Sequence, residues 1–166
     1  MAKKKKNSNN GKLLGYASVV LGLVAVCMVF VAAVTTGTKE VGALTIEATQ
    51  YSGLQVAFGY AKNDVAILGF SFLALLPVVL ALAGTVIAVL NAVKAESKVL
   101  DFVVAACFVV AGVLYFIMPS FMVFAETIPG AAASLLEFKL GAGAVVAAIC
   151  ALLAGLASLA KPFVKK

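Results

Sequence analysis

The run of sequence that decides the fold is residues 13–34, LLGYASVVLGLVAVCMVFVAAV, which carries no charged side chain. As an α-helix that rises 1.5 Å per residue, this run extends about 33 Å and can cross a hydrocarbon core of roughly 30 Å. Lysines precede it, as they precede a secretory signal peptide, but the apolar core of a signal peptide has only about 7–15 residues. We therefore expect an uncleaved membrane anchor.

Three further apolar runs share this pattern, at residues 65–93, 99–124 and 140–160. The composition agrees, because 64% of the residues are hydrophobic and 12% are charged. A soluble domain is usually nearer half apolar and a quarter charged. We therefore predict an all-α membrane protein, in which residues 13–160 form one domain, a four-helix transmembrane bundle.

Prolines and polar residues suggest where these helices bend and begin. Pro77 lies near the middle of the second run and Pro119 near the far end of the third. A proline inside a helix removes one backbone hydrogen bond and clashes with the preceding turn, so we predict a helix kink at Pro77 and either a kink or the end of the helix at Pro119. Asn63 or Asp64 is expected to cap the second helix, and Ser97 the third.

Lysine supplies all thirteen basic residues. Residues 1–12, the link at 94–98 and the tail at 161–166 hold ten of them, and the loops at 35–64 and 125–139 hold three. By the positive-inside rule, the lysine-rich segments face the cytoplasm, where they also contact anionic lipid headgroups. We expect a multi-pass protein of the cell membrane with a flexible basic leader, a basic tail and both termini cytoplasmic. The lysine-only basic composition points to a bacterial source.

The fourth run carries a small residue at every fourth position: Gly143, Ala147, Ala151 and Gly155. This spacing places all of them on one face of a helix. Small side chains let two helix backbones approach closely in lipid. We expect this stripe to serve helix packing, and packing within the bundle is favoured over packing between molecules.

The longer outer loop contains two stretches of alternating apolar and polar residues, 44–49 and 54–60. Alternation with a period of two, among Thr, Val and aromatic residues, is typical of β-strands. Residues 50–53 end in a glycine and suit the turn between them. We predict a small extracellular β-hairpin that offers an interaction surface. Its candidate residues are Leu44, Ile46, Tyr51, Gly53, Leu54, Val56, Phe58 and Tyr60.

The second outer loop offers a cover for this hairpin, which would be marginally stable alone in water. Residues 137–140 alternate between polar and apolar and predict one more short strand. Pro129 is also a suitable first residue for a short helix through residues 131–136. The two predictions are compatible, because the segments follow one another in the sequence.

Four spans, cytoplasmic termini and a hairpin in the first outer loop resemble the claudin and peripheral-myelin-protein superfamily. Gly53-Leu54 after Tyr51 is similar to part of that family's Trp…Gly-Leu-Trp signature in the same loop. The chain departs from the family pattern, because it has no tryptophan and no pair of cysteines in that loop, and the loop is shorter. The resemblance implies an architecture for most of the chain and fixes no function.

The residue types present limit which reactions and ligands we expect for this chain. The sequence has no His and no Arg, which removes the commonest metal ligand and proton shuttle, and the planar group that grips phosphate in a bidentate way. Cys27, Cys107 and Cys150 lie inside apolar runs, where cysteine acts as a small packing residue. No catalytic motif or metal-ligand spacing occurs, so we expect no enzyme and no cofactor. Topology explains the lysines without nucleic-acid binding.

Ionisable residues inside membrane spans are good pointers to function. The expected span interiors contain none, because Asp64, Asp101, Glu126 and Glu137 all fall at span boundaries. This favours a scaffold or interaction protein, whose outer hairpin contacts a protein partner or whose helices associate sideways into a homo-oligomer. The alternative is a transporter or channel component, either an accessory or an oligomeric pore subunit, since helices broken by prolines often frame membrane binding sites.

Overall fold

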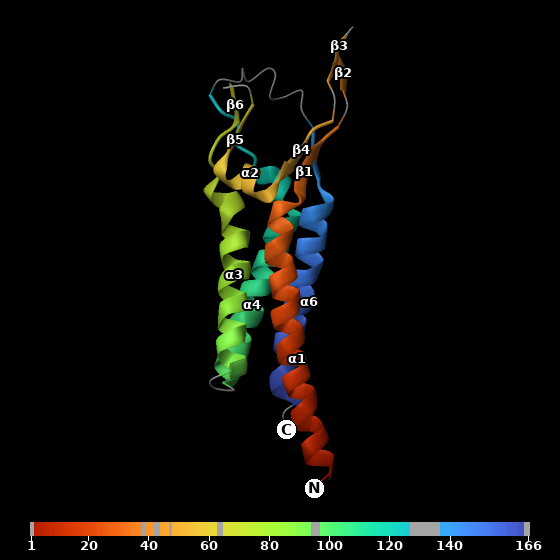
Figure 1. Ribbon diagram of the computed structural model, residues 1–166, viewed down its shortest axis with the longest axis vertical. Coiled ribbons are helices and arrows are strands. Elements are labelled where there is room, and N and C mark those ends of the chain that lie inside the picture. The colour runs from red at the N-terminus through yellow and green to blue at the C-terminus, as the bar shows by residue number, and fades with distance from the viewer. Residues whose placement is uncertain are drawn as a thin grey trace.

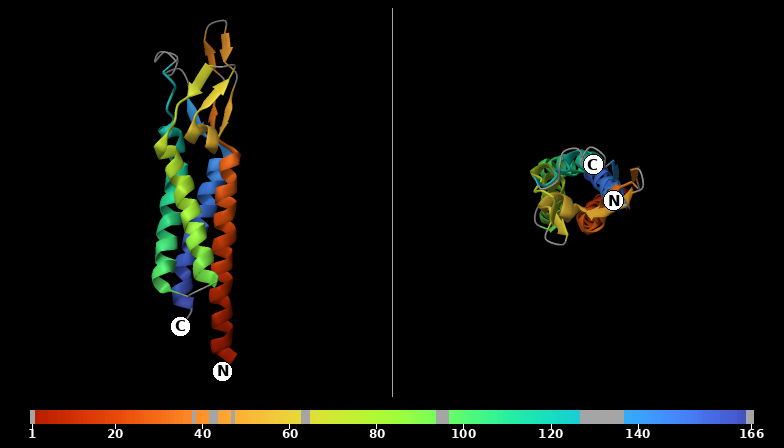
Figure 2. Two further views of the ribbon diagram at one scale, coloured as in Figure 1. Left: turned by 60° about the vertical axis from the view of Figure 1, so that its left-hand side comes forward. Right: turned by 90° about the horizontal axis from the view of Figure 1, so that it is seen from above.

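A computed structural model of the chain describes residues 2–37, 39–41, 44–46, 48–62, 65–93, 97–126 and 137–164. Four long helices run side by side, and the strands gather beyond one end of them (Figure 1). We call this the sheet end. Both chain termini lie at the opposite end (Figure 2), which we call the terminal end; it comprises residues 10–18, 88–93, 97–104 and 154–164. The prediction of a helical bundle with a small antiparallel sheet is confirmed.

All four long helices are long and apolar enough to cross a membrane. Their apolar segments have 19 to 23 residues, within the range of about 17–25 that spans a hydrocarbon core. The helices are α1 (Ala2–Cys27), α3 (Phe72–Val93), α4 (Lys98–Phe116) and α6 (Ala142–Val164), with the 3-10 helices η1 (Met28–Phe30) after α1 and η2 (Met118–Phe121) after α4.

Small residues hold the helices close together. The buried face of α1 carries Gly11, Gly15, Ser18, Gly22 and Ala25, at helical spacing. A Cβ atom on Gly22 would lie 2.5 Å from Cζ of Phe108 on α4, so a glycine is needed at this contact. Large apolar side chains on the outer faces are exposed, as expected of helices surrounded by lipid. They include Val20, Leu23, Leu82, Val86, Val110 and Leu153.

The first apolar run is not helical throughout. We expected a span at residues 13–34 after a flexible leader, but α1 begins at Ala2, and the run ends in strand β1 (Ala32–Thr36). Lysine is a good helix former and no proline precedes Cys27, so the helix continues toward the N-terminus. Hydropathy alone does not distinguish a short apolar strand such as β1 from the end of a helix.

Strand β1 is the centre of the main sheet. It pairs antiparallel with β4 (Gln50–Ser52) on one side and with β7 (Phe138–Leu140) on the other. Val34 lies opposite both Tyr51 and Leu140 in the two registers. The short strand that we predicted at residues 137–140 is confirmed, and because it joins α6 to β1 it fixes the sheet to the bundle. The predicted helix at 131–136 lies outside the described residues.

The predicted hairpin of residues 44–60 is wrong in its second half. Residues Gly53–Phe58 form a short helix, α2, instead of a strand. The Ser52 hydroxyl accepts from the backbone N–H of Gln55, and the Gln55 side chain accepts from the N–H of Ser52. This capping box satisfies two backbone donors at the start of α2 and overrides the alternation of the apolar residues.

Two other hairpins replace the predicted one. The first pairs β2 (Lys39–Val41) with β3 (Leu44–Ile46) and stands furthest from the bundle (Figure 1). The second pairs β5 (Tyr60–Lys62) with β6 (Val65–Leu68), at the start of the run that we expected to be wholly helical. Between α2 and β5, Gly59 has φ of 91°, a backbone conformation that side chains with a Cβ rarely adopt.

The second and third spans are shorter than predicted. Helix α3 begins at Phe72, after Ser71, whose hydroxyl accepts from the N–H of Ala74; the predicted caps at residues 63 and 64 lie outside the described residues. Pro77 is buried inside α3. Pro119 falls within η2, beyond the end of α4, because a proline opens a new helical turn more easily than it continues one. The bend at Pro77 stays a prediction.

Candidate functional site

The terminal end contains a buried ion pair between α4 and α6. Lys161 Nζ donates to Asp101 Oδ1 at 2.7 Å, and each side chain is 5% exposed. Our prediction that the spans contain no buried charge is therefore wrong. Asp101 lies in the first turn of α4, where the positive end of the helix dipole stabilises a carboxylate. Lys161 lies in the last turn of α6, where a cation is favoured.

Asn91 joins helix α3 to this ion pair. Its Nδ2 donates to Asp101 Oδ1 at 2.6 Å and to the backbone oxygen of Ser97 at 3.2 Å, and its Oδ1 accepts from the backbone N–H of Ser97 at 2.9 Å. Ser97 is the N-cap residue of α4, as predicted, but its side chain makes no capping hydrogen bond. Asn91 thus bonds to both backbone groups of Ser97 while it holds the carboxylate.

Helix α1 is joined to α6 by a pair of serines close to the ion pair. The hydroxyls of Ser18 on α1 and Ser158 on α6 lie 2.7 Å apart, and the Ser18 hydroxyl also donates to the Ala154 carbonyl at 3.2 Å. A cavity of about 10 Å³ separates these serines from the ion pair, close to the minimum for one water molecule. The terminal end therefore contains a buried polar cluster, which we define as Ser18, Asn91, Asp101, Ser158 and Lys161.

A sequence signal for this cluster exists. Its α6 members continue the small-residue stripe at helical spacing, because Ser158 and Lys161 follow Ala151 and Ala154 on one buried face. A lysine at such a position points into the bundle and needs a buried partner. We assigned Lys161 to the basic tail because the apolar run ends at residue 160, and a lysine just beyond a span usually reaches the headgroups. The helix continues to Val164 instead.

The predicted small-residue stripe lies inside the molecule. All four of its residues are buried. A Cβ on Gly143 would lie 2.8 Å from the carbonyl oxygen of Ala32, and a Cβ on Gly155 would lie 2.9 Å from Cγ2 of Val109. One end of the stripe therefore faces β1, and the other end faces α4.

The residues that we predicted for the outer hairpin do not share one surface. Tyr51 and Val56 are buried in the core, Gly53 starts α2 against Val29, and Phe58 is 60% exposed. Leu54 and Tyr60 are half-buried. Leu44 and Ile46 lie in β3, and the placement of their side chains lies outside the described residues.

Among the predicted hairpin residues whose side chains the structure describes, the exposed one is aromatic, Phe58. The Phe58 ring lies 6.4 Å from the ring of Phe70, which is 57% exposed. The ring of Tyr51 meets the ring of Tyr60 edge-on, with their centroids 5.8 Å apart. Burial raises the pKa of Tyr51, and the neighbouring Tyr60 adds to the shift. Phe58 and Phe70, followed by Phe72 at the start of α3, are therefore exposed aromatic side chains at the sheet end.

The described residues contain no group of three His, Cys, Asp or Glu side chains that could hold a metal ion. Their three cysteines are all free thiols. No protein-family model, curated protein or solved structure matches the chain. The resemblance to the claudin superfamily therefore stays a prediction.

Proposed function

We propose that the chain is a small integral membrane scaffold that presents its sheet end for protein–protein contact. The observation that carries this proposal is a continuous core: Val34 and Tyr51 of the sheet lie in the same apolar cluster as Tyr115 of α4 and Met118 of η2. The N–H of Gly141 donates to the Ala33 carbonyl at 2.8 Å and joins β1 to the start of α6. A surface fixed in this way loses little conformational entropy on binding.

The sheet end offers two kinds of contact to a partner. In the main sheet β4 and β7 are the outer strands, and an outer strand is a common place for a second chain to add a strand. Exposed aromatic side chains such as Phe58 and Phe70 supply contact area at low entropic cost. Sideways association of the helices into a homo-oligomer is the second form of contact in this proposal.

The orientation in this proposal places the sheet end outside the cytoplasm. Lys12, Lys98 and Lys161 lie at the terminal end, and the sequence concentrates its other lysines in the segments beside them. The positive-inside rule assigns such an end to the cytoplasm. A partner of the sheet end is then an extracellular or membrane protein.

Site-specific photocrosslinking in native membranes tests the proposal. A photoreactive phenylalanine analogue replaces Phe58 at the sheet end or, as a control, Phe102, which is 48% exposed on α4 near the terminal end. We expect position 58 to give a discrete protein adduct, or a ladder of copies of the chain if it self-assembles, and position 102 to give lipid adducts. No protein adduct at position 58, or the same adducts at both positions, contradicts the proposal.

The buried ion pair favours a transporter or channel component as the second candidate. Ionisable residues within spans often mark ion pathways. In the described bundle, however, the next buried polar side chain beyond the serine pair is Thr85, whose hydroxyl bonds to its own helix at Ala81. Phe108 and alanines fill the centre. A solute or ion flux into liposomes that Asp101→Asn abolishes, with the fold retained, would favour this candidate over the scaffold.

A further inference from the structure

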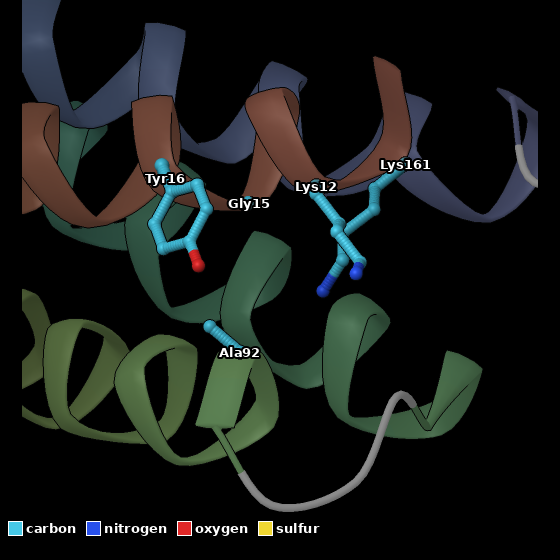
Figure 3. Close-up of a pocket in the computed structure, with 5 residues that line it drawn as sticks. All are labelled: Lys12, Gly15, Tyr16, Ala92 and Lys161. Carbon is cyan, nitrogen blue, oxygen red and sulfur yellow. The ribbon is translucent and has the colours of Figure 1, made fainter. Parts of the chain in front are cut away.

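A second, larger cavity lies beside the buried polar cluster at the terminal end. Its volume is about 90 Å³, several times the roughly 10–15 Å³ that one water molecule needs. Three helices line it, α1 through Lys12, Gly15 and Tyr16, α3 through Ala92, and α6 through Lys161. Figure 3 shows the two lysine side chains extending together toward the space that Tyr16 and Ala92 border.

The described groups around this cavity carry more positive than negative charge. Two ammonium groups, those of Lys12 and Lys161, line the cavity, and one carboxylate, that of Asp101, holds the second ammonium from the far side at 2.7 Å. An ammonium has three N–H donors, and Asp101 is the one partner of Lys161 among the described residues. Lys161 is therefore fixed in position and still able to donate into the cavity.

The small size of Gly15 keeps the cavity open. A Cβ at this position would already lie 3.4 Å from Cε and 3.6 Å from Nζ of Lys161. A longer side chain would occupy the space in front of the ammonium. The cavity is thus a pre-formed pocket with two cationic donors and one phenol, and its donors suit a compact anion with several acceptor oxygens.

The position of the cavity indicates where such an anion comes from. The exposed apolar face of α1 continues through Val20, Tyr16 and Leu13 to the edge of the cavity. Tyrosine is enriched at the level of lipid headgroups, and lysine near a helix end reaches toward the same level. We propose that this cavity binds one phosphate group, carried by the headgroup of an anionic lipid. This proposal requires that the bundle spans a membrane, and it does not depend on a partner for the sheet end.

Three variants separate this site from general attraction between lysines and anionic lipid. Lys12→Gln removes an exposed ammonium that lines the cavity. Lys98→Gln, the matched control, removes an exposed ammonium at the same end of the bundle that does not line the cavity. Ala92→Leu fills the cavity without a change of charge. Thermal unfolding of each variant shows whether it folds.

Native mass spectrometry of the full chain in detergent measures the binding, with phosphatidylglycerol and phosphatidylcholine of the same acyl chains as probes. We expect phosphatidylglycerol to bind in preference to phosphatidylcholine. Lys12→Gln and Ala92→Leu should each weaken its binding about tenfold, since each disturbs charge-assisted hydrogen bonds. Lys98→Gln should change it less than about twofold, because a single exposed surface charge contributes little.

Competition with inorganic phosphate distinguishes the two sources of the phosphate group. Failure of millimolar phosphate to displace the lipid supports a headgroup site. If phosphate displaces the lipid from the unchanged protein but not from Lys12→Gln, the same site binds phosphate from solution. Equal binding of the two lipids overturns the proposal. Equal losses of phosphatidylglycerol binding in Lys12→Gln and Lys98→Gln also overturn it.

Discussion

The two ends of the bundle are held by different kinds of interaction. At the sheet end, backbone hydrogen bonds and an apolar core join three strands to the helices. At the terminal end, a few buried side chains join the helices across long stretches of sequence, 60 residues for Lys161 and Asp101 and 140 for Ser18 and Ser158. The contacts at the sheet end are those of a sheet and its core, whereas at the terminal end a buried ion pair and its polar neighbours add to an apolar contact that includes Ala88, Val104 and Ala154.

Loss of the ion pair should have the largest effect. Lys161→Met leaves Asp101 charged, buried and unpaired, which costs about 3–5 kcal/mol in comparable buried pairs. Unfolding of the purified protein by sodium dodecyl sulfate in mixed micelles measures the change in free energy of unfolding. The double variant Asp101→Asn with Lys161→Met should be less destabilised than Lys161→Met alone, because no lone charge remains.

Lys98→Met is the control for this prediction, because Lys98 is an exposed lysine at the same end. Its cost should stay within about 0.5 kcal/mol, as for most surface substitutions. If Lys161→Met and Lys98→Met destabilise the protein equally, the terminal end does not depend on the ion pair.

A close backbone contact at the sheet end gives the second prediction. A Cβ on Gly141 would lie 2.5 Å from the carbonyl oxygen of Ala32 and 2.7 Å from the carbonyl carbon of Ala33. Backbone atoms held in a sheet cannot move away cheaply, so Gly141→Ala should cost about 1–3 kcal/mol. Gly37→Ala should cost much less, because a Cβ there meets nothing within 4 Å. The same unfolding assay compares them, and equal costs would mean that the junction of β7 and α6 is loose.

The capping box of α2 should contribute less. Ser52→Ala removes the hydroxyl that accepts from the N–H of Gln55, and loss of such a cap costs about 1 kcal/mol. Ser52→Gly should cost only a few tenths of a kcal/mol, because glycine tolerates the N-cap position. Hydrogen exchange of the Gln55 amide provides a local readout. Unchanged exchange in Ser52→Ala would show that α2 forms without its cap.

The smallest expected effect is a change in the stability of the protein at alkaline pH. Burial raises the pKa of Tyr51 above its usual 10.0, so the folded protein retains this proton more strongly than the unfolded chain does. The resulting stability is fully present below about pH 10 and is lost as the pH rises toward the raised pKa. Tyr51→Phe should therefore flatten the decline in stability above pH 10. An identical decline in both proteins would contradict the burial of this phenol.

The long apolar elements were predictable, and the short ones were largely not. Four helices followed from long apolar runs, because length and hydropathy determine which segments can cross a bilayer. The strands β1 and β6 escaped prediction, since both lie inside apolar runs, where a strand and a helix have the same composition. β7 was found because it alternates in a polar context.

The candidate site was missed for a related reason. The sequence places Asp101 and Lys161 near the ends of their runs, which suggests contact with water. Their burial depends on how α4 and α6 pack together, with Ala105 and Gly155 at the contact, and the sequence does not give that arrangement. The capping box of Ser52 and Gln55 is different, since its spacing is visible in the sequence, but the prediction of a strand from the alternating pattern did not consider it.

We propose that the two ends of the bundle face opposite sides of a membrane, with the sheet end outside the cytoplasm. This orientation is tested most directly by labelling intact cells with a membrane-impermeant maleimide, in a background without Cys27, Cys107 and Cys150. We expect Lys139→Cys, in β7, to be labelled in intact cells and Lys98→Cys to be labelled only after permeabilisation. Labelling of Lys98→Cys but not of Lys139→Cys in intact cells, or equal labelling of both, would contradict it.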